Sequence, residues 1–104
     1  MGVVYKRKVI MAKVVYNAKY GGYGLSTDAI QWLKNHFIAE EDVYELDRHD
    51  PLLVQCVEVL GEKANDDFSY LKVKELKGSK YIIREYDGWE SVIEPEDIDW
   101  IIVK

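Results

Sequence analysis

The chain has 104 residues, of which 48% are hydrophobic, 12% aromatic and 32% charged, and its net charge is −5. This length suits one domain, and the composition is that of a folded domain rather than a disordered segment. No apolar run is long enough to cross a bilayer, and the N-terminus lacks a signal-peptide pattern. We therefore expect a cytoplasmic protein with no membrane contact.

Basic residues are concentrated near the N-terminus. The first 20 residues carry five of the 14 basic residues and no acidic one, so the rest has nine basic residues against 19 acidic ones. A phosphate-binding surface needs clustered positive charge, so we expect no nucleic-acid partner. The acidic body suits either contact with a basic protein surface or simple solubility.

Residues 1–10 are expected to form an N-terminal extension or an edge strand, and residues 11–104 one domain. Met11 is a candidate for an alternative translation start, which would make residues 1–10 an extension. Residues 12–16 are apolar and largely β-branched, which predicts the first strand of the domain.

A glycine-rich loop follows this strand and leads into a helix. Three glycines within residues 21–24 allow positive φ angles and close backbone approaches. Ser26 is a good N-cap, and apolar residues at helical spacing continue to about His36. Free amides at a helix start favour an anion, so the loop is a candidate ligand site; the alternative is a tight turn in which its tyrosines pack. The candidate ligand residues are Asn17, Tyr20, Gly21, Gly22, Tyr23 and Ser26.

Residues 40–51 are expected to form an acidic connector with one short strand, and Val43, Tyr44 and Leu46 are its apolar anchors. Asp50 and Pro51 then predict the start of a second helix, with aspartate as the N-cap and proline in the first turn. The helix over residues 51–60 is apolar on nearly every side. Either it is central, or its outer face forms a homodimer.

Arg48 and His49 lie at the start of this second helix. Arginine pairs with phosphate or carboxylate, and histidine exchanges protons near neutral pH. If this pair shares one end of the domain with the glycine loop, the two would form a pocket for a phosphorylated small molecule. The alternative is that Arg48 pairs with a neighbouring acid, while His49 is solvated.

The last forty residues predict β-structure. Residues 71–74 alternate between apolar and charged, as in a half-exposed strand. Asp87 and Gly88 predict a two-residue hairpin turn between strands at residues 81–86 and 89–93. In this register Tyr86 faces Trp89, Ile82 faces Ile93, and Glu85 faces Glu90 as an unfavourable like-charge pair unless solvent or a cation relieves it.

Residues 94–97 predict a turn or one helical turn, and residues 100–103 predict a final strand. Strands gathered after two helices predict an α+β fold: a single small domain with a largely antiparallel sheet and two helices packed on one face.

The sequence lacks the residue patterns of a metal site and of a catalytic nucleophile. The carboxylates between Glu85 and Asp99 are numerous, but neither histidine is near them in sequence, so we expect no metal and no cofactor. No serine or cysteine has a nucleophile's local setting. The lone cysteine, Cys56, is expected to be a buried thiol in a reducing compartment. We therefore expect no catalytic residue and favour a non-enzyme.

Several blocks of the sequence resemble a family of short, uncharacterised proteins of phages and large DNA viruses. The resemblance covers most of residues 12–94 and leaves residues 1–10 outside. It implies a small α+β fold and an intracellular, virus-encoded accessory protein, and it carries no activity or catalytic residue to transfer. The blocks are residues 14–17, 20–26, 48–51, 60–65 and 81–88, and the glycine loop and the block from Arg48 to Pro51 are the most specific.

The leading functional hypothesis is a non-enzymatic binding protein, such as a virus-encoded accessory factor acting on a host component. Its basis is the acidic body, the apolar second helix and the lack of a catalytic set. The alternative is a binder or hydrolase of a nucleotide-like or phosphorylated small molecule, using the glycine loop with Arg48 and His49. A structural role in a virion is a third hypothesis.

Overall fold

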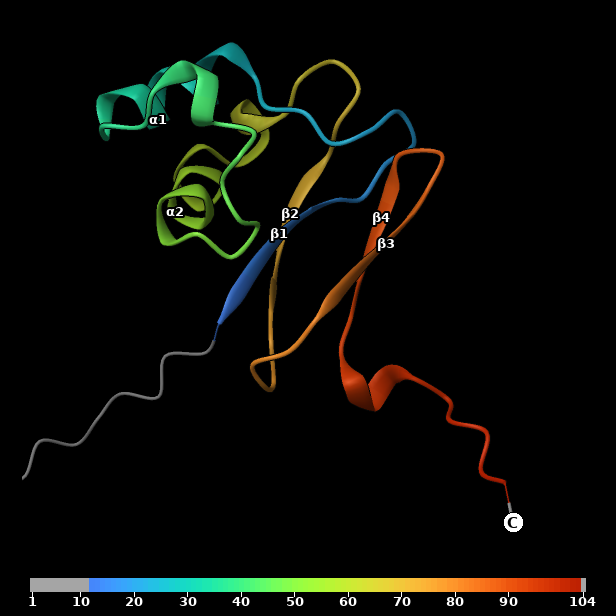
Figure 1. Cartoon of the computed structure of the whole chain (residues 1–104). Helices are drawn as coiled ribbons and strands as arrows, with labels where there is room; N and C mark the ends of the chain where they lie inside the picture. Colours follow the sequence, from blue (N-terminus) through green and yellow to red (C-terminus); the bar gives the residue numbers. More distant parts are fainter. Residues whose placement is uncertain (1–11, 104) are drawn as a thin grey trace, which may run out of the picture.

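The computed structural model describes residues 12–103, and its strands form two antiparallel pairs beside two helices (Figure 1). The α+β class of a single small domain is confirmed. The predictions about residues 1–10 and about Met11 lie outside the described residues. In chain order the elements are β1 (Lys13–Asn17), α1 (Thr27–Asn35), the 3-10 turn η1 (Glu40–Asp42), α2 (Pro51–Leu60), η2 (Gly61–Ala64), β2 (Leu71–Glu75), β3 (Ile82–Tyr86), β4 (Trp89–Ile93) and η3 (Pro95–Asp97).

The strands pair as β1 with β2 and β3 with β4, so two small sheets replace the single sheet that the sequence predicts. The second edge of β1 is already occupied. The Val15 amide donates to the carbonyl of Arg48 at 2.8 Å, and the Asn17 amide donates to the Glu90 carboxylate at 2.9 Å. Because these amides are taken, β4 cannot extend the β1 ladder and instead lies beside β1 through side-chain contacts.

The predicted hairpin register is confirmed. Tyr86 faces Trp89, and Ile82 faces Ile93. The turn residues have φ angles of 50° at Asp87 and 87° at Gly88, as a mirror-image turn requires.

Both helices lie on the same side of the β1–β2 sheet, where α2 contacts the two strands and α1 packs on α2 (Figure 1). The helix α2 lies between α1 and this sheet, which accounts for its apolar composition, although Val59 remains 61% exposed. The homodimer through residues 51–60 stays a prediction. The main core consists of apolar side chains from these layers: Val15, Leu25, Ala29, Leu33, Val43, Leu53, Val54, Cys56, Val57, Ala64 and Leu71.

The predicted helix starts are confirmed. The Ser26 hydroxyl accepts a hydrogen bond from the Ala29 amide at 3.0 Å, and the Asp50 carboxylate accepts one from Leu52 at 2.9 Å. Pro51 begins α2, and Gly61 ends it with a φ of 57°. The Cys56 thiol is fully buried, and burial raises its pKa to about 11. None of the helices in residues 12–103 is long and apolar enough to span a membrane.

A second, smaller core lies between the two sheets. Because side chains alternate along a strand, Val14 points away from the helices and meets Val92 of β4 and Leu76 beyond β2. Tyr16, Tyr81 and Ile83 pack around these three residues.

Two predicted strands are wrong. The connector has no strand: residues 43–46 form turns after η1, and although Val43 is buried, they pair with no strand within residues 12–103. Residues 100–103 have no regular secondary structure and pair with no strand among the described residues, and they lead away from the folded body (Figure 1). A strand needs a partner as well as a β-forming sequence.

Candidate functional site

Asn17, a predicted ligand residue, is fully buried and ties three segments together. Its side-chain amide donates to the carbonyls of Lys19 and Gly88, both at 2.7 Å, and its side-chain oxygen accepts from the Tyr70 amide at 2.8 Å. Both donors and the acceptor oxygen of this amide are therefore engaged within the chain. The structure places Asn17 where β1, the start of β2 and the hairpin turn meet.

The glycine loop packs against the hairpin turn. The Gly21 amide donates to the Asp87 carbonyl at 3.1 Å, and the φ angles of Gly21 and Gly22 are 119° and 107°. A Cβ on Gly88 would collide with the backbone of Gly22, and one on Gly21 would lie 2.8 Å from the Phe68 carbonyl oxygen. These close approaches between backbones account for Gly21 and Gly88 without a ligand, and the positive φ angle accounts for Gly22.

Arg48 does meet the glycine loop, because its guanidinium lies 3.5 Å from the centre of the Tyr23 ring. The same guanidinium forms a two-point ion pair with Glu90, with N–O distances of 2.6 and 2.9 Å. This cation relieves the predicted like-charge pair of Glu85 and Glu90. Burial raises the pKa of Tyr23 to about 12, although the nearby charge of Arg48 acts in the opposite direction. The two predicted clusters are thus side by side, and the arginine between them is engaged by a carboxylate of the chain.

His49 and Ser26 lie apart from this ion pair. His49 is half exposed, and its Nδ1 lies 2.7 Å from the Tyr81 hydroxyl. Burial raises the pKa of Tyr81. The Ser26 hydroxyl accepts from α1 and donates to the carbonyl of Lys63 in η2, so η2 packs beside the start of α1.

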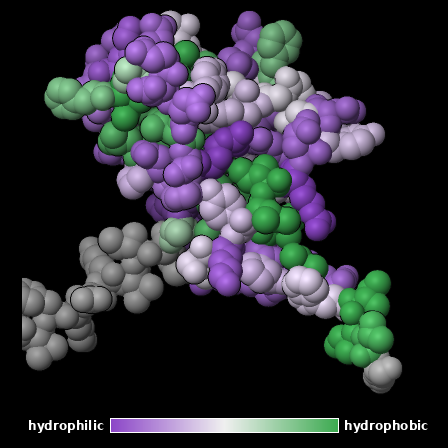
Figure 2. Space-filling model, viewed as in Figure 1, coloured by the Kyte–Doolittle hydropathy of each residue, from purple (hydrophilic) through white to green (hydrophobic). Residues whose placement is uncertain are grey.

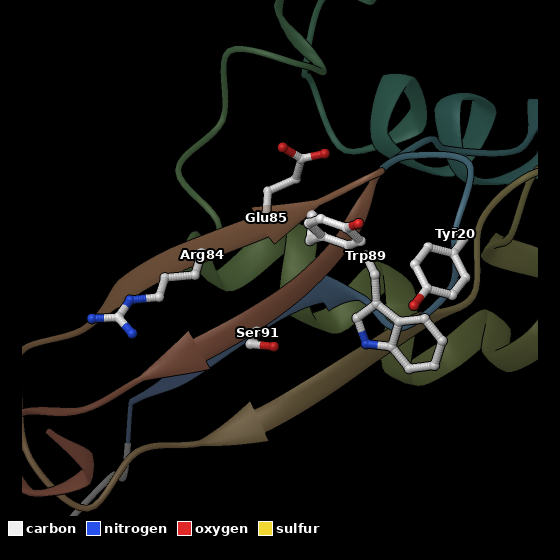
Figure 3. A pocket seen from close by; sticks show the side chains of 6 residues that line it. Tyr20, Arg84, Glu85, Trp89 and Ser91 are labelled. Carbon is white, nitrogen blue, oxygen red and sulfur yellow. The ribbon is translucent and has the colours of Figure 1, made fainter. Parts of the chain in front are cut away.

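The sequence analysis missed a groove on the outer face of the β3–β4 sheet. The register places Tyr86 beside Trp89 and Arg84 beside Ser91 on this face. Tyr20 comes from the glycine loop and lies edge-on to Trp89, with ring centres 5.0 Å apart. Figure 3 shows these two rings at one end of the groove, with Ser91 and Arg84 farther along. This aromatic groove has a volume of about 460 Å³ and is lined by Tyr20, Arg84, Glu85, Tyr86, Trp89 and Ser91.

A sequence signal for the groove was present. The predicted register alone puts Tyr86 and Trp89 opposite each other, and alternation then puts Arg84 and Ser91 on the same face. Tyr20 is the only predicted ligand residue that lines the groove. Its approach to Trp89 depends on the packing of the loop on the hairpin, which the sequence does not indicate.

Comparison with known proteins adds no assignment: no family model matches the chain, and no curated protein or solved structure matches it. Within residues 12–103, no group of three or more histidine, cysteine or acidic side chains is placed to hold a metal ion.

Proposed function

We propose that this chain is a non-enzymatic binding domain that docks a partner protein in the aromatic groove. The observation that carries the proposal is the exposure of three aromatic side chains on the β3–β4 hairpin and its adjoining loop. Tyr20, Tyr86 and Trp89 are 57%, 71% and 42% exposed. Arg84 is exposed beside them.

The composition of the groove favours a protein as the partner. Tyrosine, tryptophan and arginine are the side chains that most often dominate the free energy of protein–protein binding. Their large contact area is ordered at low entropic cost when a paired strand holds them. Arg84 adds a fixed positive charge, so the complementary partner surface carries an apolar side chain beside a carboxylate.

The chemistry of the groove favours binding over catalysis. The side chains with the largest pKa shifts, Tyr23 and Cys56, do not line it. Catalytic sites usually gather groups with perturbed pKa values in one cleft. Within this proposal the chain acts in the cytoplasm, and its resemblance to phage and large-DNA-virus proteins supports a host component as the partner.

The direct test is site-specific photo-crosslinking in the lysate of the candidate host. A photoreactive amino acid at Tyr86 is expected to trap one discrete protein. The same amino acid at Phe37, which is 99% exposed after α1, is the matched control and is expected not to trap that protein. Arg84→Glu changes an exposed side chain, so the fold is retained, and the Tyr86 product should fall by about tenfold or more. A product that Arg84→Glu leaves unchanged contradicts the proposal, as does the absence of any Tyr86 product.

A second candidate function is supported by the geometry of Tyr20, Trp89 and Arg84. Two aromatic rings with a cation nearby could hold the base and phosphate of a nucleotide-like ligand. The groove volume of about 460 Å³ falls in the range of small-molecule sites. AMP and ATP are the probes, followed by backbone amide chemical shifts. Saturable shifts confined to residues around Trp89 and lost in Arg84→Ala would favour this function, whereas unchanged spectra favour the protein partner.

A further inference from the structure

A second groove, here called the lysine groove, lies between the β1–β2 sheet and β4. It has a volume of about 330 Å³ and is lined mainly by Tyr16 of β1, Lys72 and Lys74 of β2, and residues 89–92 of β4. Val73 packs against the main core, so alternation along β2 turns Lys72 and Lys74 to the opposite face of the sheet. The groove therefore lies on the face of the β1–β2 sheet that the helices leave uncovered.

The lysine groove adjoins the aromatic groove at β4. Trp89 and Ser91 line both grooves, and both side chains are exposed. Arg84 lies opposite Ser91 in the register of the hairpin. Figure 2 shows apolar side chains gathered over the β3–β4 sheet, with hydrophilic ones beside them. The two grooves thus form one surface that crosses β4 at Trp89 and Ser91.

The charge of Lys72 is not balanced by any acidic side chain of the described residues. The Lys72 side chain is exposed, and its ammonium lies 5.3 Å from the centre of the Tyr70 ring. None of the salt bridges within residues 12–103 includes Lys72 or Arg84. Residues 1–11 contain no acidic side chain to supply a partner. Each groove is therefore lined by one cation without an ion pair in the described part of the chain, Lys72 in the lysine groove and Arg84 in the aromatic groove.

Lys74, the other lysine of this groove, is already balanced by acidic side chains. Its ammonium lies 3.8 Å from the Asp97 carboxylate and 4.0 Å from the Glu94 carboxylate. Glu94 is 3% exposed and also accepts the amides of Lys77 and Gly78 at 2.9 and 3.3 Å, which fixes the turn after β4. Lys74 therefore serves the fold, and Lys72 is the cation of this groove that remains for a ligand.

The acidic side chains that line the two grooves are engaged elsewhere. Glu90 lines the lysine groove, but its carboxylate is buried and paired with Arg48. Glu85 lines the aromatic groove, and its carboxylate accepts the Gly88 amide at the hairpin turn. Because neither carboxylate forms an ion pair with the two remaining cations, the surface offers positive charge beside aromatic rings. A complementary ligand carries negative charge beside an apolar group.

A short acidic segment of a protein fits this surface better than a nucleic acid does. A nucleic-acid strand needs a row of cations along its phosphates, whereas Lys72 and Arg84 are two cations on either side of β4. The chain also has a net charge of −5, which repels a long polyanion. Alternate side chains of an extended segment point the same way, so a carboxylate, an apolar group and a second carboxylate suit Arg84, Trp89 and Lys72 in turn.

We propose that the partner protein binds across β4 with one extended acidic segment. One carboxylate of the segment pairs with Arg84, an apolar side chain packs on Trp89, and a second carboxylate pairs with Lys72. This inference rests on the proposed function, because it gives the chemistry of the segment that the aromatic groove receives. It extends the docking site onto β2, where the proposed function alone places no contact.

The test uses a short blocked peptide with the order glutamate, serine, leucine, serine, glutamate, and follows the backbone amide chemical shifts of the full chain. Saturable shifts are expected at Lys72, Arg84 and Trp89 with peptide up to millimolar concentration. The same peptide with glutamine in place of both glutamates is the control and should bind at least about tenfold more weakly. No saturable shift at these residues, or equal binding of the two peptides, overturns the proposal.

Lysine variants separate the lysine groove from the overall charge of the chain. Lys72→Glu changes an exposed side chain and should weaken binding of the glutamate peptide by about tenfold, whereas Lys72→Arg should keep it. Lys63→Glu makes the same charge change on an exposed residue of η2 and should leave binding unchanged. Equal losses in Lys72→Glu and Lys63→Glu, or no loss in Lys72→Glu, contradict the proposal. A single-stranded oligothymidylate that shifts the same amides at lower concentration than the peptide would also overturn it, in favour of a nucleic acid.

Failure of this inference and failure of the proposed function give different results. If Tyr86 traps a protein from the host lysate and Lys72→Glu leaves that product unchanged, docking stays in the aromatic groove and the acidic segment is wrong. If the glutamate peptide binds as expected but Tyr86 traps nothing, the chemistry of the surface stands and the host partner is wrong.

Discussion

Arg48 and Glu90 lie 42 residues apart in sequence and form a two-point ion pair, with N–O distances of 2.6 and 2.9 Å. The same Glu90 carboxylate accepts the Asn17 amide at 2.9 Å. One buried carboxylate therefore joins β4 to β1 and to the segment before α2. The pair holds the two small sheets together where backbone pairing between them is absent.

Arg48→Met is expected to lower the free energy of unfolding by about 3 kcal/mol, because it leaves the Glu90 carboxylate buried without its cation. Urea unfolding followed by far-ultraviolet circular dichroism measures the change. Glu58→Gln removes the partner of Lys13 in an exposed pair and should have a much smaller effect. A fully stable Arg48→Met would show that the ion pair is not structural and would return Arg48 to the candidate ligand residues.

Asn17→Ala should destabilise the domain by about 2 to 4 kcal/mol, since it leaves the Tyr70 amide and two carbonyls without their partner. Asn35→Ala is the control, because Asn35 lies at the exposed end of α1 and accepts only from Gln31. Thermal unfolding of both variants gives the comparison. If Asn17 serves a ligand rather than the fold, its variant will melt at the temperature of the wild type.

Alanine substitutions at three glycines should lower the free energy of unfolding by amounts that depend on the φ angle and on the space around each glycine. At Gly88 the new Cβ would meet the backbone of Gly22, and φ is 87°, so both collision and strain apply. Gly22 has a φ of 107° but open space around it, and Gly78 has open space without positive φ. We expect losses above about 2 kcal/mol at Gly88, about 1 kcal/mol at Gly22 and almost none at Gly78. An equal effect at all three sites in chemical unfolding would contradict the packing of the loop on the hairpin.

Stability should fall at alkaline pH because of Tyr23. Its folded pKa of about 12 lies above the ordinary value of 10.0, so its contribution is present below pH 10 and is lost as the pH rises toward 12. A shift of about two units corresponds to about 2 to 3 kcal/mol. The unfolding free energy of Tyr23→Phe should therefore decline less than that of the wild type between pH 10 and pH 12. Parallel declines for the two proteins would show that Tyr23 ionises as easily in the folded state.

For the candidate ligand residues, the sequence predicted which of them lie close together but not which groups of the chain they bind. They were chosen for their residue types and for their places near the helix starts. The structure brings Tyr23 and Arg48 into contact, as expected if the glycine loop and the Arg48 cluster share one end of the domain. It also engages the side chain of Asn17 with the Tyr70 amide and the Gly88 carbonyl, and the guanidinium of Arg48 with the Glu90 carboxylate. Those partners follow in the chain by more than forty residues, so no local pattern could identify them.

The sequence by itself determined the elements that depend on contacts between residues close together in the chain. Ser26, Asp50 and Pro51 fixed the helix starts through contacts within one turn, and the Asp87 turn fixed the hairpin register through adjacent residues. Tertiary structure alone decided which edges pair. The occupation of the β1 edge by Arg48 and Glu90 divided the strands into two sheets, and the fixed turn at Glu94 left residues 100–103 unpaired. A β-forming sequence specifies a strand only when a partner edge lies beside it, and that depends on the arrangement of the whole chain.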